Sequence, residues 1–260
     1  MNKSLIAIMA ALLGGTPALS ADLYIGDPVQ DPGDPAVVVS GGWYLRGHLG
    51  MSNQRLGSME HEAFDDPNIL HGFLDEASFD SAPLAGVGVG YQFNDWLRLD
   101  GIVEYRGKAD FSALDRYDDL TNGSGWDGTN DYDGAKSEWL LMANAYVDIG
   151  DWNGIKPYIG AGIGASRNKI SRFRDINVPQ LGVAYADSDP SWNFAWALHA
   201  GVAYQATDRL AIDFGYSYVD LGDAKTGDIR TFDGSPGAAP MHFKDITSHD
   251  FKLGMRYKLQ

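Results

Sequence analysis

The chain has 260 residues, of which 44% are hydrophobic and 12% aromatic, so a wholly disordered protein is excluded. Its formal net charge of −15 argues against nucleic acid as a partner, because a face that binds phosphates needs clustered Lys and Arg. The chain has no cysteine, which excludes disulfides, thiolate metal sites and cysteine nucleophiles.

The N-terminus is typical of a secretory signal peptide over residues 1–20. It has one early cation, Lys3, a short apolar run over 5–13, and the small residues Ala18 and Ser20 at a spacing that a signal peptidase accepts. The apolar run is shorter than the roughly 20 residues that a helical membrane anchor needs. We therefore expect a signal peptide at 1–20, a periplasmic leader at 21–41 and a folded domain at 42–260.

Eight segments of the folded domain alternate with a period of two residues, which is the period of a β-strand. In LAIDFGYSYV (210–219), for example, every second residue is a bulky Leu, Ile, Phe or Tyr until the final valine. The segments are 43–54, 85–93, 97–106, 138–149, 157–166, 196–205, 210–219 and 250–259.

One segment also fits a dinucleotide-binding fingerprint. Gly160, Gly162 and Ala165 match the pattern G-x-G-x-x-G/A, which carries weight only when a helix follows directly. The next residues, SRNKISRFRD, are polar and basic and have no apolar stripe of useful length. Glycines recur at every second position here, so we interpret the run as one face of a strand and predict no cofactor.

The connections between the eight segments alternate in length. Residues 94–96, 150–155 and 206–209 form short links, whereas 56–81, 107–136, 167–192 and 220–247 form long ones. Short periplasmic turns and long extracellular loops are the layout of an outer-membrane barrel, and strands of about ten residues can cross a bilayer. The sequence predicts an all-β, eight-stranded antiparallel up-and-down transmembrane β-barrel located in the outer membrane.

A water-soluble eight-stranded barrel is the alternative, and it would turn the bulky side chains inward. Eight strands enclose too little space for so many Tyr, Trp, Leu and Phe side chains. Aromatic residues also gather at the predicted strand ends, as two interfacial belts require. Those near the short links are Trp43, Phe93, Trp96, Trp152, Tyr204 and Tyr257, and those near the long links are Tyr105, Trp139, Trp196, Tyr218 and Phe251.

The opposite face of the strands carries charges of both signs, which a membrane barrel would enclose in its lumen. Buried charges persist when they are paired, so we expect crossing salt bridges that plug the barrel. The alternative is that some of these groups line a thin aqueous path and select ions. The residues are Arg46, Arg98, Asp100, Glu104, Arg106, Glu138, Asp148, Asp213, Lys252, Arg256 and Lys258.

The segments GVGVGYQFNDWLRLDGIVEYRG, PYIGAGIG and AIDFGYSYVDLGD resemble the eight-stranded outer-membrane β-barrel family of Gram-negative bacteria, of the opacity-protein and OmpA-barrel type. The resemblance covers residues 41–260. It implies roles as surface structural proteins, adhesins or narrow pores, and an assembly signal for the insertion machinery formed by Lys252, Gly254, Tyr257 and Leu259. Members usually end on an aromatic residue, whereas this chain ends with Leu259 and Gln260.

Candidates for catalysis and metal binding are weak. Ser248 and His249 are adjacent, and adjacent residues of a strand point to opposite faces, so they cannot share a proton easily. His48 and His199 lack partners at metal-ligand spacing and are interpreted as interior polar residues. Asp131 and Asp133 lie in a stretch similar to a calcium loop, but the flanking ligand positions do not fit. We predict no enzyme, no metal and no cofactor.

The long connections suggest partners outside the membrane. Residues 107–136 carry seven Asp against two Lys and one Arg. The third connection is basic instead, with Arg167, Lys169, Arg172 and Arg174, which we expect either to pair with lipid or lipopolysaccharide phosphates or to balance the acidic neighbours. The sequence thus indicates a non-enzymatic structural protein of the cell surface. A narrow pore or an adhesin with a host or surface ligand remains the alternative.

Overall fold

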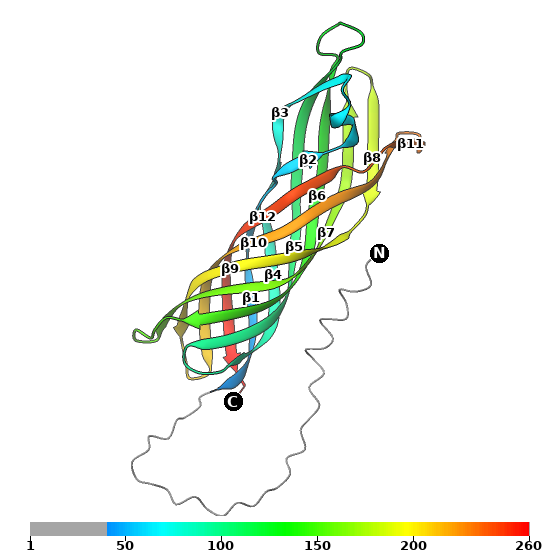
Figure 1. Ribbon diagram of the computed structural model, residues 1–260. Coiled ribbons are helices and arrows are strands. Elements are labelled where there is room, and N and C mark those ends of the chain that lie inside the picture. The colour runs from blue at the N-terminus through cyan, green and yellow to red at the C-terminus, as the bar shows by residue number, and fades with distance from the viewer. Residues whose placement is uncertain (1–40, 260) are drawn as a thin grey trace, which may run out of the picture. The chain divides into compact units, whose positions relative to one another are not determined.

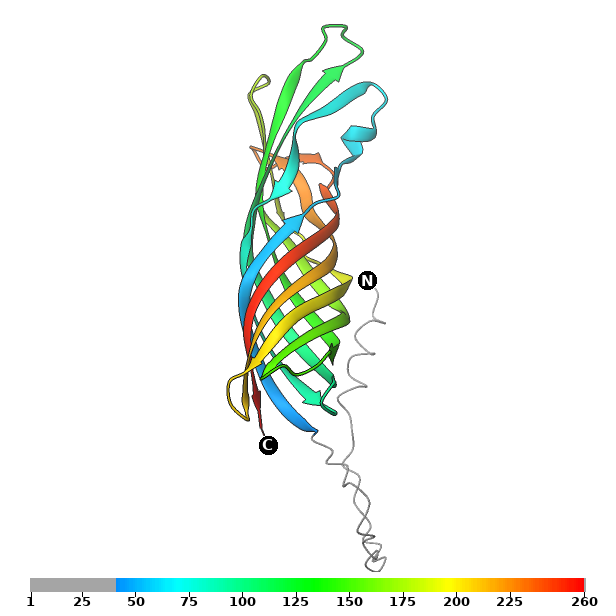
Figure 2. The same ribbon diagram turned by 90° about the vertical axis from the view of Figure 1, so that its left-hand side faces the viewer.

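The computed structural model describes residues 41–259, and eight of its antiparallel strands close into a barrel (Figures 1 and 2). Each strand pairs with the next along the series, and β12 returns to pair with β1. The all-β antiparallel barrel is therefore confirmed. Its strands are β1 (Gly42–Arg55), β4 (Ala82–Gln92), β5 (Leu97–Asp119), β6 (Gly128–Asp148), β7 (Ile155–Asn177), β9 (Ser191–Gln205), β10 (Leu210–Thr231) and β12 (His242–Lys258).

The glycine-rich run is part of β7, which continues as a strand from Ile155 to Asn177. The interpretation as a strand face is therefore confirmed, and no helix follows Ala165. The only helical segment within 41–259 is the single 3-10 turn η1 (Glu62–Asp65), and no helix there is long and apolar enough to cross a membrane. The predicted signal peptide and leader lie outside the described residues, apart from Gly41.

The three short links are confirmed. They are the turns β4–β5, β6–β7 and β9–β10, at one end of the barrel. The prediction of loops at the other end is wrong, because strands β5, β6, β7 and β10 run far beyond the predicted limits. Four shorter strands join them: β2 (Ser58–Glu60), β3 (Ile69–Phe79), β8 (Gly182–Ser188) and β11 (Pro236–Ala238). We call residues 56–81, 107–136, 167–192 and 220–247 the outer extension (upper part of Figure 1).

Pairing is continuous through most of the outer extension. β3 pairs with β5, β8 lies between β7 and β10, and β2 pairs with β12. This pairing continues the sheet well past the barrel wall as ordered strands instead of loops. In outer-membrane barrels the end with long connections faces the exterior.

Local irregularities at the base of the outer extension explain why the alternation of the sequence fails there. The register of β5 shifts between Arg106 and Ala109, so inward-facing positions change from even to odd numbers. The parity of the inward-facing positions also reverses on β7 at Arg172, on β10 at Gly222 and on β12 near Asp245, and these three residues have positive φ of 52–66°. Each extra residue is a β-bulge that reverses which face of the strand is buried.

Beyond these bulges the interior is apolar. Aromatic rings of four strands pack together, with ring centroids of Phe111 and Phe243 4.9 Å apart and those of Phe79 and Phe111 5.8 Å apart. The outer extension therefore has a core like that of a water-soluble protein, which the sequence analysis did not predict. Its large members are Met59, Phe79, Phe111, Tyr132, Ile170, Phe173, Leu221, Met241, Phe243 and Ile246, all at most 7% exposed.

Candidate functional site

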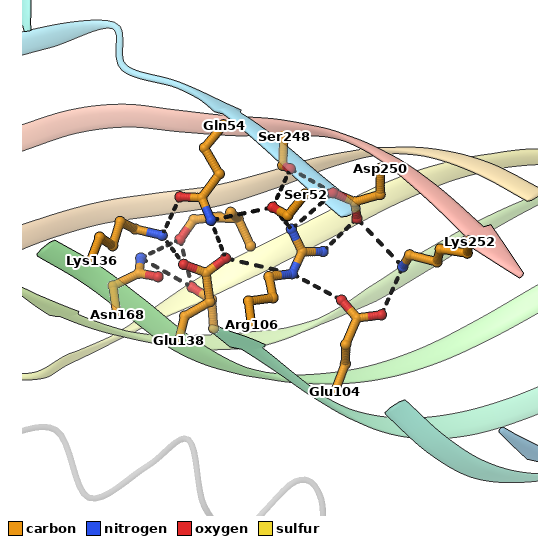
Figure 3. Close-up of polar contacts among 12 residues, drawn as sticks. Ser52, Gln54, Glu104, Arg106, Lys136, Glu138, Asn168, Ser248, Asp250 and Lys252 are labelled. Carbon is orange, nitrogen blue, oxygen red and sulfur yellow. Dashed lines mark hydrogen bonds and ion pairs between the residues drawn. The ribbon is translucent and has the colours of Figure 1, made fainter. Parts of the chain in front are cut away.

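Arg106 is the centre of an ion-pair network inside the barrel, next to the apolar core (Figure 3). Its guanidinium donates from Nε to Glu104 Oε1 at 2.9 Å and from Nη2 to Asp250 Oδ2 at 2.7 Å. Glu138 Oε1 lies 3.5 Å from the same Nε. All four side chains are fully buried, so each carboxylate depends on this guanidinium and on its immediate neighbours for compensation.

Two lysines complete this upper network on either side of Arg106. Lys136 contacts Glu138 and donates to Gln54 Oε1 at 2.9 Å. Lys252 donates to Glu104 Oε2 at 2.8 Å and lies 3.4 Å from Asp250 Oδ2. The network therefore balances three cations with the three carboxylates of Glu104, Glu138 and Asp250.

A second, lower network lies nearer the short turns and is balanced in the same way. It consists of three ion pairs: Arg46 with Asp100 at 2.6 Å, Arg98 with Asp148 at 3.2 Å, and Arg256 with Asp213 at 2.9 Å. Two tyrosine rings contact one guanidinium, because the Cζ atom of Arg98 lies 4.2 Å from the Tyr146 ring centroid and 4.6 Å from that of Tyr158. Such cation–π contacts stabilise a guanidinium that has left water.

The structure places all ten of the lumen charges named first in the sequence analysis in these two networks, whereas Lys258 lies half-buried at the lower rim. Sequence reasoning missed Lys136, Asp250 and Gln54. Lys136 lies at the end of the long connection predicted over 107–136, although it continues the even-numbered inward series of β6. Asp250 has the same parity as Lys252, and that signal could have identified it.

Little free space remains inside the barrel. One cavity of about 20 Å³ lies among Arg46, His48, His199 and Lys252, and another of about 10 Å³ lies beside Tyr44 and Arg256. Spaces of this size hold about one water molecule each. The side chains of the two charge networks surround these cavities, and the apolar core of the outer extension lies beyond the upper network.

The residues considered for catalysis and metal binding have ordinary structural partners. Ser248 points inward and donates to Asp250 Oδ1 at 2.5 Å, whereas His249 lies on the other face with Nδ1 2.7 Å from Tyr216 Oη. His48 Nε2 lies 2.7 Å from Glu104 Oε2, and His199 lies between Ser217 and Asn144. No group of three possible metal ligands occurs within residues 41–259.

Asp131 and Asp133 are part of strand β6 rather than of a loop. Nearby, Asp115 is buried in the outer extension, where Tyr132 Oη donates to it at 3.2 Å and the Asn130 amide at 3.1 Å. Burial, together with the charges of Asp115 and Asp131, raises the pKa of Asp175 to about 7. This carboxyl group therefore titrates near neutral pH.

The aromatic residues predicted as belts lie on the outer surface of the barrel, near its two ends. Trp43, Phe93, Trp96, Trp139, Trp152, Tyr204 and Tyr257 are 42–61% exposed, and Trp196 and Tyr218 are partly covered. Tyr105 and Trp139 pack together on adjacent strands with ring centroids 4.9 Å apart. In the final strand, Lys252 is buried and Tyr257 and Leu259 are exposed, and the role of this segment as an assembly signal stays a prediction.

Comparison with known proteins agrees with this architecture. A family model described as outer membrane protein beta-barrel domain matches residues 10–258. An uncharacterized protein of Brucella abortus is 32% identical over 98% of this chain and 97% of its own length. Outer membrane protein PagN of Salmonella typhimurium is 29% identical over 66% of this chain and 71% of its own length.

Among solved structures, Neisserial surface protein A is similar at 17% identity, with a TM-score of 0.45 over 84% of this chain and 97% of that one. The family match spans nearly all of the described residues and includes the whole barrel. The chain therefore belongs to the outer-membrane β-barrel family and is a protein of the outer membrane.

Proposed function

We propose that this protein is a non-enzymatic component of the cell surface, in which the barrel anchors a rigid outer extension. The observation that supports this most strongly is that side chains occupy the interior at three levels, from the short turns to the outer extension. Two balanced charge networks are followed by an apolar core. A barrel filled in this way contributes position and rigidity, and the surfaces available to partners are those of the outer extension.

A narrow pore is the function that this geometry opposes. An ion that crossed the upper network would have to separate Arg106 from Glu104 or Asp250, which are held at 2.9 and 2.7 Å. Leaving a buried charge without its partner costs several kcal/mol. The ion would then meet the packed rings of Phe111 and Phe243, which carry no oxygen atom to replace its water.

Single-channel recording of the refolded chain in a planar bilayer tests the sealed lumen. We expect no discrete openings from the native chain. We also expect none from Arg98→Gln or Glu104→Gln, because the apolar core remains closed in both variants. Discrete openings of the native chain, with ion selectivity that either substitution changes, would contradict the proposal and make the protein a pore.

An adhesin is the second candidate, and exposed apolar side chains at the tips of the outer extension favour it. Leu181 is 89% exposed, Phe232 77%, Val178 66% and Leu120 55%. They lie in the hairpin connections β5–β6, β7–β8 and β10–β11. The strands that these hairpins connect are neighbours in the sheet, and apolar surface at such tips is available to other macromolecules.

Bacteria that display the full chain can be compared with bacteria that display Leu120→Ser/Leu181→Ser/Phe232→Ser. If the tips mediate adhesion, attachment to cultured host cells falls severalfold in the triple variant. Gln180→Ser is the matched control, because Gln180 is an exposed polar neighbour of Leu181. Equal attachment of all three strains, at equal surface amounts of protein, excludes the tips as the adhesive surface.

A further inference from the structure

The structure changes the set of cations expected to contact lipids. Arg172 of β7 forms an ion pair with Asp110 of β5, across the intervening strand β6, and Arg174 Nη2 lies 3.5 Å from Asp133 Oδ2 on the adjacent strand β6. These two arginines therefore balance acidic residues of the sheet. Arg167 and Lys169 are exposed and, within residues 41–259, form no ion pair or side-chain hydrogen bond. The same is true of Lys108, which the sequence analysis did not include.

These three unpaired cations lie together on one face. Arg167 is opposite Trp139 in the β6–β7 register, and Lys169 is opposite Ser137. Lys108 is the outward residue of the β5 bulge, beside the pair Ala109 and Lys136 on the neighbouring strand β6. Since adjacent strands lie about 4.8 Å apart and alternate residues of a strand about 7 Å apart, the three long side chains can reach one common anion.

The three cations also lie close to the upper aromatic belt of the barrel. Arg167 lies level with Trp139, and Lys169 lies two residues further along β7. Lys108 lies three residues beyond Tyr105 on β5, and Tyr105 and Trp139 are the packed aromatic pair of the upper belt. If this belt marks the membrane boundary, the cations are at the level of the lipid headgroups. In a chain with a net charge of −15, cations that have no partner within residues 41–259 fit an anionic headgroup at this level better than they fit the rest of the acidic surface.

An apolar depression lies below the cations on the same three strands. A cavity of about 320 Å³ opens on the outer wall, where Ala143, Ala145 and Ala161 replace the bulky side chains present elsewhere. Ala161 is six residues from Arg167 along β7, a separation of about 20 Å in a strand. Acyl chains extending from a headgroup at the cations would therefore pass over this depression.

We propose that Lys108, Arg167 and Lys169 bind a phosphate group of the outer leaflet's phosphorylated glycolipid, lipopolysaccharide, with its acyl chains against the alanine-lined depression. The guanidinium of Arg167 suits a phosphate because it donates two parallel hydrogen bonds, and the two ammonium groups add charge. The proposal does not depend on whether the lumen conducts or the tips adhere.

Binding of bisphosphorylated lipid A to the full chain in detergent micelles tests this site, with the bound fraction read by native mass spectrometry. For Lys108→Gln/Arg167→Gln/Lys169→Gln we expect affinity to fall roughly tenfold or more, because the phosphate loses its charged donors. The matched control is Arg172→Gln/Arg174→Gln/Lys225→Gln, which removes three cations that are already paired with Asp110, Asp133 and Asp189. It should change affinity by less than about twofold, since no lipid contact is lost.

Dephosphorylated lipid A distinguishes the phosphate from the acyl chains. The native chain should bind it as weakly as the first triple variant binds the phosphorylated lipid. Equal losses in both triple variants would mean that only net charge matters, and equal binding of both lipids would mean that only the acyl chains matter. Either result overturns the proposal.

Discussion

At the scale of single residues, Arg106 is the side chain on which the interior depends most. Its guanidinium contacts Glu104, Glu138 and Asp250, and no solvent reaches any of the four. A buried pair is only weakly favourable as a whole, because taking both charges out of water offsets their attraction. Removing one partner is different, since the remaining charges stay buried without compensation.

We therefore expect Arg106→Ala to lower the free energy of unfolding by about 3–5 kcal/mol. Arg174→Ala is the comparison, because its pair with Asp133 is largely exposed, and such pairs contribute about 0–1 kcal/mol. Urea unfolding of the refolded chain in lipid vesicles measures both values. A loss of less than 1 kcal/mol in Arg106→Ala would show that the upper network rearranges around the missing cation.

At the scale of the elements, the bulges mark the points beyond which the sequence pattern does not predict which side chains face inward. Inside the barrel wall the alternation was regular, and positions such as Glu104 and Asp213 could be placed inward from their parity alone. On the outer side of Arg172, Gly222 and Asp245 the parity of the inward-facing positions reverses. The apolar residues that face inward there therefore do not continue the alternation of the barrel strands. An extra residue in a strand cannot be recognised from the period-two pattern of that strand alone, because a bulge is defined by the register with the neighbouring strand.

The paired strands β6 and β7 of the outer extension also contain a pH-dependent position. Asp175 has a folded pKa of about 7 against an ordinary value of 3.8, because it is partly buried beside Asp115 and Asp131. The folded state thus holds its proton more tightly than the unfolded state does. Stability from this group is complete below about pH 4 and is lost as the pH rises through 7.

Hydrogen exchange of the backbone amides at 130–133 should accordingly become faster between pH 5 and pH 8, after correction for intrinsic exchange. Asp175→Asn should remove this dependence and keep the amides protected at pH 8, because the amide side chain carries no charge. Asp228→Asn, a change at an exposed carboxylate of the same extension, should leave the native profile intact. A native profile that is flat over this range would rule out titration of Asp175 near neutral pH.

At the scale of the whole molecule, the sequence was sufficient for the fold class, the eight transmembrane strands and the short turns. Those features depend on local alternation and on links of a few residues, both of which are visible in one chain. The apolar core of the outer extension depends on Phe79, Phe111, Phe173 and Phe243, which come from four separate strands. These side chains pack together because of long-range strand pairing and the bulges, so the local sequence pattern does not predict their contact.

The bulges have a consequence for insertion depth. Below them, apolar side chains face outward toward lipid, and above them they face inward to the core. If the protein moved outward, the apolar wall would enter water. If it sank, the charged outer surface with Lys108 and Lys169 would enter hydrocarbon. The positions of the bulges along the chain therefore define the vertical position of the protein in the bilayer and set the membrane thickness that it fits best.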